Sequence, residues 1–191
     1  MSEPLIHESS LVEAGVYLGS GVKIWHFCHL DKGSYISDDT VLGQNVYIGK
    51  DVHIGKGCRI QNNVSVYSGV ELEDYVFLGP SCVFTNVKTP RAFSLVGPSG
   101  FSKTLVKTGA SIGANATIVC PRIIGAYSLV GAGSLVSKDV RDYELVYGNP
   151  AKHQGWVCNC GCKLEEDLHC KSCGANYIKT SSGLVPQTQE G

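Results

Sequence analysis

Five cysteines lie close together near the C-terminal end of the sequence: Cys158, Cys160, Cys162, Cys170 and Cys173. Four thiolates satisfy the tetrahedral coordination of zinc, and so short a segment can scarcely bury a core without such a ligand. Cys170 and Cys173 have the spacing of one half-site, whereas the other three cysteines compete for the two remaining places. The spacing predicts one structural zinc site, with a redox-active cysteine pair as the competing interpretation.

The segment between Phe84 and Val106 could also carry chemistry. It is basic, with Lys88, Arg91 and Lys103, and it contains proline and glycine. Long loops that interrupt a regular fold are usually functional. The planar guanidinium of Arg91 suits a carboxylate or a phosphate of a substrate, and the alternative is a solvated loop cation.

Two further clusters contain aromatic, histidine and amide side chains. The first runs from Trp25 to His29, where contact with a second subunit is favoured over a substrate role. The second runs from Gln61 to Tyr67 and includes Asn62 and Asn63. These amides could reach a ligand, but asparagine also tolerates the left-handed backbone conformation that tight corners require.

The elements that must position these residues repeat every six residues. The first repeated position is apolar throughout: Ile6, Val12, Leu18, Ile24, Leu30, Ile36, Leu42, Ile48, Ile54, Ile60, Val66, Leu72, Leu78 and Phe84. Four residues further on, every side chain is small or β-branched: Ser10, Val16, Val22, Cys28, Ser34, Thr40, Val46, Val52, Cys58, Val64, Val70, Val76 and Cys82. Neither a helix nor an ordinary strand has this period, whereas a parallel β-helix that turns a corner every six residues does.

A second series of the same kind runs from Val106 to Val136, out of register with the first. The repeat is therefore interrupted by an insertion at about residues 86–105. If the insertion replaces one corner, Ile118 lies directly over Phe84 and Cys120 over Asn86. Residues eighteen apart then stack in columns, because three repeats make one coil.

Composition excludes several classes of function. The formal net charge is −1 and no basic cluster is present, so nucleic acids and membrane surfaces are poor candidate partners. The first residues lack the features of a signal peptide, and no apolar run approaches eighteen residues. The uneven spread of the nine cysteines argues against a secreted disulfide framework, and a cytoplasmic protein is expected.

The repeat resembles the hexapeptide-repeat acyltransferases. The resemblance rests on pairs of an aliphatic residue and glycine: Leu42-Gly43, Ile48-Gly49, Ile54-Gly55, Leu78-Gly79, Ile112-Gly113, Ile124-Gly125 and Val130-Gly131. It implies an all-β fold, a left-handed parallel β-helix with three flat faces, and a homotrimer. The expected organisation is a β-helix domain over residues 1–152, a zinc-ribbon-like module over 153–179 and a flexible tail over 180–191.

Longer motifs resemble one group within that family. They are Val83-Phe84-Thr85-Asn86 with Pro90-Arg91-Ala92, the run from Gly109 to Cys120, Gly148-Asn149-Pro150-Ala151 and the terminal cysteines. The group is the bacterial nucleotide-sugar N-acetyltransferases, especially those that acetylate the 3-amino group of a UDP-2-acetamido-3-amino-2,3-dideoxy-glucuronate. The implied function is acetyl transfer from acetyl-CoA for lipopolysaccharide O-antigen or another surface polysaccharide. The segment Cys120-Pro121-Arg122-Ile123 departs from the Cys-Gly-x-Thr of the group.

The resemblance also implies roles for particular residues. Asn86 is the expected catalytic residue, which orients the sugar amine near the thioester. The expected substrate-binding residues are Arg91, Asn62, Asn63, Tyr67 and His29. The expected acetyl-CoA-binding residues are Ala114, Ala132, Lys138, Asn149, Pro150 and Lys152. The expected zinc ligands are Cys158, Cys160, Cys170 and Cys173.

The chemistry does not demand a strong general base. If the sugar amine has a pKa of roughly 8, a useful fraction is neutral near neutral pH, and the departing thiolate can accept the proton. Orientation then supplies much of the acceleration. Because His29 lies three coils below Val83 in its own chain, a catalytic histidine would have to come from another subunit.

Three alternative functions remain open. One is a dTDP-amino-deoxysugar N-acetyltransferase. Another is a γ-type carbonic anhydrase, which needs three histidines on one metal, whereas the repeat separates His26, His29 and His53. The last is a non-catalytic assembly subunit that uses the zinc module for docking.

Overall fold

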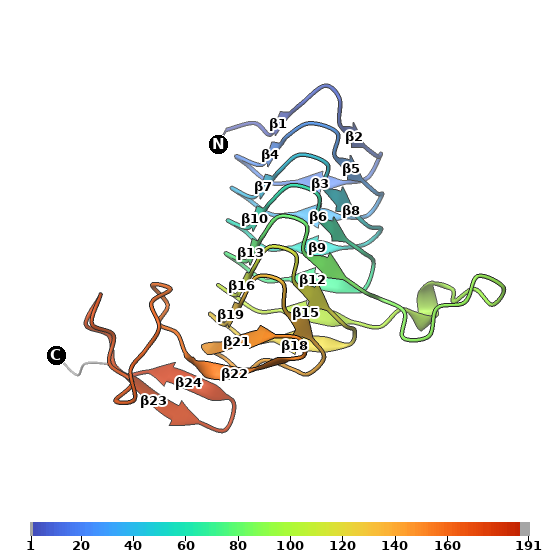
Figure 1. Cartoon of the computed structure of the whole chain (residues 1–191). Coiled ribbons are helices and arrows are strands. Elements are labelled where there is room, and N and C mark those ends of the chain that lie inside the picture. Colours follow the sequence, from blue (N-terminus) through green and yellow to red (C-terminus); the bar gives the residue numbers. More distant parts are fainter. Residues whose placement is uncertain (1, 188–191) are drawn as a thin grey trace.

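The computed structural model describes residues 2–187, and most of them form a parallel β-helix of short strands (Figure 1). The first sheet contains β1 (Leu5–Ile6), β4 (Lys23–Ile24), β7 (Val41–Leu42), β10 (Arg59–Ile60), β13 (Phe77–Leu78), β16 (Ser111–Ile112), β19 (Leu129–Val130), β21 (Glu144–Gly148) and β22 (Ala151–Trp156). The second contains β2 (Leu11–Val12), β5 (His29–Leu30), β8 (Tyr47–Ile48), β11 (Ser65–Val66), β14 (Val83–Phe84), β17 (Thr117–Ile118) and β20 (Leu135–Val136). The third contains β3 (Tyr17–Leu18), β6 (Tyr35–Ile36), β9 (His53–Ile54), β12 (Val70–Leu72), β15 (Thr104–Val106) and β18 (Arg122–Ile124).

The strand register confirms the predicted coil of eighteen residues. Ile6 pairs with Ile24 in the first sheet, and His29 pairs with Tyr47 in the second. From Ile24 to Phe84, every residue of the six-residue series is at most 2% exposed. Ile6 is 44% exposed because it lies in the terminal coil, at the end of the stack. Burial of such a side chain contributes about 1.5–3 kcal/mol, so this repeated position forms the core.

The predicted insertion lies between β14 and β15. Leu72 pairs with Val106, and Phe84 pairs with Ile118, so the chain rejoins the β-helix in register after the loop. The loop extends away from the stack and contains the 3₁₀ helix η1 (Pro98–Gly100) (Figure 1). Its tip is exposed, with Phe93 and Leu95 exposed by 89% and 88%.

The C-terminal region packs against the last coil, and no break in the fold separates the two at the predicted boundary. The antiparallel hairpin of β21 and β22 contains the predicted boundary between residues 152 and 153. A second hydrophobic cluster joins the two regions: Tyr143, Trp156, Cys158, Leu164, Cys170, Tyr177 and Leu184. Among residues 2–187, no helix is long and apolar enough to cross a membrane.

The predicted loose tail from residue 180 is wrong for residues 180–186. These residues complete a hairpin of β23 (Tyr177–Thr180) and β24 (Gly183–Pro186). The backbone of Asp142 bonds to Ser182 and Leu184, which fixes β24 against the last coil, and Leu184 is 1% exposed. Residues 188–191 lie outside the described part of the chain.

Candidate functional site

Asn86 lies at the neck of the inserted loop, directly after β14 and Thr85. Its side-chain Nδ2 donates to the backbone oxygen of Ser68 at 3.1 Å. Its backbone oxygen accepts from the N–H of Ser102 at 2.8 Å, which joins the outgoing and returning chains of the loop. Asn86 is half-buried, and among residues 2–187 its side-chain oxygen accepts no hydrogen bond. The side-chain nitrogen of Asn86 is therefore fixed by a hydrogen bond, whereas its side-chain oxygen is free to accept one.

The chain that returns from the loop passes so close to Gly69 that this position has no room for a side chain. Gly69 has a positive φ of 95°, and a Cβ there would lie 2.8 Å from the backbone oxygen of Ser102. The neck is therefore a close approach of two backbones.

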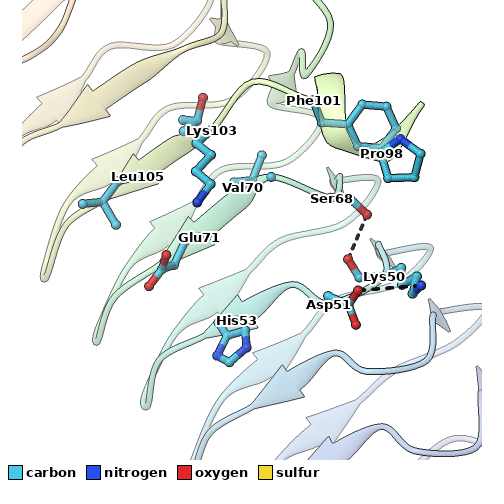
Figure 2. A pocket seen from close by; sticks show the side chains of 12 residues that line it. Lys50, Asp51, His53, Ser68, Val70, Glu71, Pro98, Phe101, Lys103 and Leu105 are labelled. Carbon is cyan, nitrogen blue, oxygen red and sulfur yellow. Dashed lines mark hydrogen bonds and ion pairs between the residues drawn. The ribbon is translucent and has the colours of Figure 1, made fainter. Parts of the chain in front are cut away.

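A cavity of about 660 Å³ lies beside this neck. Figure 2 shows that its wall combines three parts of the chain, the first being corner residues such as Lys50, Asp51 and Ser68. His53, Glu71 and Leu105 come from adjacent strands of the third sheet, and Pro98 and Phe101 come from the loop. The cavity is large enough for the sugar portion of a nucleotide sugar.

The charged groups of this cavity come from the corner, from β12, which contributes Glu71, and from the returning chain. Lys50 forms an exposed ion pair with Asp51 at 3.8 Å. Lys103 also lines the cavity and, within residues 2–187, forms no ion pair. Sequence reasoning identified Lys103 as basic but assigned it no site, and it missed His53 and Phe101. The eighteen-residue spacing could have placed His53 in the column of Glu71, because Glu71 pairs with His53.

None of the five predicted substrate-binding residues lines this cavity in its own chain. Arg91 is exposed in the loop, and its guanidinium donates to the backbone oxygen of Pro90 at 2.8 Å. The side-chain oxygens of Asn62 and Asn63 accept from Gln44 and Asn45 of the preceding coil, at 2.9 and 3.0 Å. Asn63 also has a φ of 61°, so both asparagines stabilise a corner.

Tyr67, the fourth of these residues, is 40% exposed beside the ring of Tyr47. Neither residue lines the cavity at the loop neck. Asn62 and Asn63 precede β11, whereas Asn86 follows β14 in the same sheet. The asparagines and Asn86 therefore occupy different corners of the β-helix.

His29 lies on β5 within a hydrogen-bonded group of its own. Its Nε2 is 3.3 Å from carboxylate oxygens of both Glu13 and Asp31. The hydroxyl of Tyr47 donates to Asp31 at 2.6 Å, and burial, followed by this bond, raises the pKa of Tyr47 to about 12. The strands β8 and β11 separate β5 from β14, as the repeat predicted. His29 is therefore remote from Asn86 within one chain.

A second cavity, of about 320 Å³, lies at the C-terminal end of the β-helix. It brings together Lys138, Pro150 and Lys152 from the predicted acetyl-CoA set, and adds Glu144 and His153, which sequence reasoning missed. Nothing in the sequence indicates which acidic residue is buried, and Glu144 is only 5% exposed.

The other predicted acetyl-CoA residues lie at corners near this end. Ala114 and Ala132 are in one corner column, because the N–H of Gly133 bonds to the oxygen of Ala114. Gly113 is required there, since a Cβ would lie 2.5 Å from the N of Ala132. Asn149 lies in the turn between β21 and β22.

Four cysteines converge in the C-terminal region. The Sγ atoms of Cys158, Cys160, Cys170 and Cys173 all lie within 4.8 Å of one another. The separations are 3.4 Å for Cys158–Cys173 and 3.6 Å for Cys160–Cys170. Two thiolates bound to one tetrahedral zinc are roughly 3.8 Å apart, given zinc–sulfur bonds of about 2.3 Å. The four-sulfur donor set therefore fits zinc.

The backbone around these cysteines favours thiolates at two of the four positions. The N–H of Cys162 is the main cause that lowers the pKa of Cys160 to about 6. The N–H of Cys173 lowers the pKa of Cys170. Cys162 itself is outside the cluster, and its backbone oxygen accepts from the N–H of Cys158.

Within residues 2–187, the only other group of three or more potential metal-ligating side chains is Glu13, His29 and Asp31. Neither group contains three histidines. A three-histidine metal site of the carbonic anhydrase kind is therefore not formed by the described part of one chain.

Comparison with known proteins identifies the repeat. Residues 33–66 and 51–86 match the family model described as bacterial transferase hexapeptide (six repeats). A dTDP-3-amino-3,6-dideoxy-alpha-D-galactopyranose 3-N-acetyltransferase from Aneurinibacillus thermoaerophilus is 50% identical over 92 residues, which cover 47% of each chain. The bifunctional protein GlmU from Thermotoga maritima is 31% identical over 97 residues, covering 49% of this chain and 22% of that protein. The matches thus span about half or less of the relatives' own lengths.

Two solved structures have a similar fold. A hexapeptide-repeat-containing acetyltransferase from Vibrio cholerae O1 biovar eltor, complexed with acetyl coenzyme A, has a TM-score of 0.56 and 24% identity; 65% of this chain and 70% of that chain are covered. The acetyltransferase domain of PglB from Neisseria gonorrhoeae, in complex with acetyl coenzyme A, has a TM-score of 0.50 and 18% identity, with coverage of 79% and 57%. At these identities the likeness concerns the fold.

Proposed function

We propose that the chain transfers an acetyl group from acetyl-CoA to the amino group of a nucleotide-linked amino sugar, a proposal that the match of residues 33–86 to the hexapeptide-repeat family model supports. The 50% identity to an enzyme named for 3-N-acetylation of a dTDP-linked amino sugar supports this reaction. It makes a dTDP-linked 3-amino sugar the first candidate acceptor.

The observation that carries the proposal is the loop neck. The β-helix is regular except at one insertion, and there a half-buried amide lies beside the Ser68 wall of a 660 Å³ cavity. A site of this kind holds a small acceptor and orients one reacting group. Asn86 adjoins this cavity through Ser68, which lines the cavity and accepts the hydrogen bond from Asn86.

In the proposed reaction, the neutral sugar amine attacks the thioester carbon. A carbon–nitrogen bond forms, the carbon–sulfur bond breaks, and the departing thiolate accepts the proton that the amine releases. The free side-chain oxygen of Asn86 can accept a hydrogen bond from the amine and so direct its lone pair at the thioester. The bond from Nδ2 to Ser68 keeps that oxygen in place.

A UDP-linked amino uronate is the second candidate acceptor. Lys103, which lines the cavity without an ion pair in the described chain, favours an anionic group such as a carboxylate or a phosphate. Arg91 would bind this group from the loop, and its exposure in one chain is compatible with contact across a subunit interface.

The corner positions support a homotrimer as the catalytic form. Asn62, Asn63 and His29 lie at other corners or coils than Asn86 within one chain, so a neighbouring chain must present them if they bind the acceptor at Asn86. Tyr67, in contrast, directly precedes Ser68, the hydrogen-bond partner of Asn86. The exposed Trp25 (44%) and Phe27 (61%) provide apolar surface for such an interface.

The C-terminal cavity is the candidate site for acetyl-CoA. Lys138, Pro150 and Lys152 line it, and Asn149 with the corner column of Ala114 and Ala132 would extend the site along the coils. The four converged cysteines would hold a structural zinc ion next to this end of the β-helix.

A thiol-release assay tests the reaction. Purified protein is mixed with acetyl-CoA and, in turn, with dTDP- and UDP-linked 3-amino sugars, 4-amino sugars and the corresponding 3-hydroxy sugars. The proposal predicts release of CoA only with 3-amino sugars, with a product heavier by one acetyl group in mass spectrometry. Absence of release across the whole panel, in protein that is folded and binds CoA, would contradict it.

A further inference from the structure

The C-terminal cavity contains a buried acid paired with a histidine that no proposed step has used. We propose that His153, together with Lys138 and Lys152, binds the 3′-phosphate monoester of the CoA donor, and that Glu144 is its positioning residue. The identity of the donor rests on the proposed function, whereas the phosphate site follows from the cavity.

The carboxylate of Glu144 accepts hydrogen bonds from two neighbours, Arg141 and His153. Arg141 donates to Glu144 from its backbone N–H at 2.8 Å, from Nε at 3.2 Å and from an Nη at 2.9 Å. His153 Nδ1 is 2.7 Å from the Oε1 of Glu144. Burial opposes ionisation of Glu144, but the bonds from Arg141 and then His153 outweigh it, so the pKa of Glu144 lies below its ordinary value.

This arrangement determines what His153 can offer. His153 Nδ1 lies 2.7 Å from Glu144 Oε1 and 3.3 Å from an Nη of Arg141. An ionised carboxylate only accepts hydrogen bonds, so the shorter contact is a bond that Nδ1 donates to Glu144. The other ring nitrogen, Nε2, is then the atom available to a ligand. When the ring is doubly protonated, Nε2 donates a charge-assisted hydrogen bond, the type that phosphate oxygens accept best.

The ring of His153 is held from a second side by the C-terminal region. It meets the ring of Trp156 edge-on at 5.0 Å, and Arg141 lies over the same indole at 4.7 Å. Trp156 is 7% exposed and belongs to the cluster that contains Cys158 and Cys170. The cysteine region therefore buttresses the histidine at the edge of the cavity.

The balance of charge in the cavity favours an anion. Lys138, Lys152 and His153 are all exposed, so their charged ends are accessible. Of the two acids of the lining, Glu144 forms an ion pair with Arg141, whereas Asp139 accepts from the N–H of Ile123 at 3.0 Å and keeps its charge. The two lysines of the lining therefore outnumber the one acid that has no ion pair in the described chain. A phosphate monoester carries up to two negative charges and can accept from all three groups.

Binding to CoA and to dephospho-CoA, measured by titration calorimetry without any sugar, tests the inference. His153→Ala should lower CoA affinity by roughly tenfold, the loss expected for one charge-assisted hydrogen bond, and should change dephospho-CoA affinity less than twofold. Glu144→Gln, of nearly the same size, should reduce the preference for CoA by a smaller factor. His7→Ala, a histidine directly after β1 in the first coil, is the matched control and should change neither affinity.

Equal losses for the two ligands, or no loss for either, would overturn the phosphate site, provided that circular dichroism and thermal melting of the variant match the wild type. A reduced affinity for the dTDP sugar but not for CoA would assign the cations to the acceptor's diphosphate instead and would equally overturn it. If the CoA preference depends on His153 but no amino sugar is acetylated, the proposed function fails alone. If acetylation proceeds and the preference is absent, this inference fails alone.

Discussion

At the scale of single residues, the structure separates polar groups that stabilise the β-helix from groups that remain free for a ligand. Asn62 and Asn63 use their side-chain oxygens to join adjacent coils, whereas the side-chain oxygen of Asn86 has no partner in the described chain. The sequence alone could not make this distinction, because all three asparagines occur at corners. It depends on whether a neighbouring coil presents a donor.

Arg91 provides a test of the acceptor at this scale. If its guanidinium binds a uronate carboxylate across an interface, Arg91→Ala should raise KM for a UDP-amino uronate by about tenfold, since a hydrogen bond to a charged group contributes about 1.5–3 kcal/mol. KM for a dTDP-amino-deoxysugar, which lacks the carboxylate, should change less than twofold. Lys88→Ala in the same exposed loop is the control. Equal effects on the two sugars would remove the carboxylate from the role of Arg91.

At the scale of elements, glycines at the corners decide whether coils can stack. A Cβ at Gly113 would lie 2.5 Å from the backbone N of Ala132, whereas one at Gly97 in the loop would meet nothing within 4 Å. Gly113→Ala should therefore destabilise the protein by about 1–3 kcal/mol through forced backbone movement. Gly97→Ala should change stability by less than about 0.5 kcal/mol. Urea unfolding of both variants checks the difference, and equal stability would show that the coils have room to adjust.

Elements that follow the six-residue repeat could be predicted from the sequence, whereas elements outside the repeat could not. The core, the coil length and the register across the insertion follow from a strict period, so Phe84 pairs with Ile118 as expected. The course of the loop could not be predicted, because Pro98 and Phe101 approach the third sheet through contacts that have no period. The hairpin of β23 and β24 was missed because its strands depend on pairing with each other and with Asp142.

The candidate site could be predicted only in part, because some of its residues belong to no motif or repeat. The four converging cysteines and the three residues of the C-terminal cavity were identified through motifs. Glu144 and His153 belong to no motif, and their pairing depends on the antiparallel register of β21 and β22.

At the scale of the whole molecule, the cysteine region and the β-helix share one hydrophobic cluster, so their stabilities should be coupled. Cys173→Ser should reduce bound zinc from one ion per chain to none, and should lower the melting temperature, because loss of a structural zinc ligand removes folding free energy. Cys162→Ser, whose thiol lies outside the cluster, should retain the metal. Metal analysis with calorimetric melting distinguishes these outcomes. Retention of zinc by Cys173→Ser would place the ligands elsewhere.

The central claim is that the loop neck is the place of acetyl transfer, and Asn86→Ala tests it most directly. Loss of a group that orients or stabilises the reacting centre costs about 10²–10³ in kcat. Loss of its single bond to Ser68 costs only about 1 kcal/mol of stability. The decisive measurement is kcat for CoA release by Asn86→Ala with the best 3-amino sugar, beside its melting temperature. The account predicts a hundredfold or greater fall in kcat in a folded protein, and a kcat within threefold of wild type would contradict it.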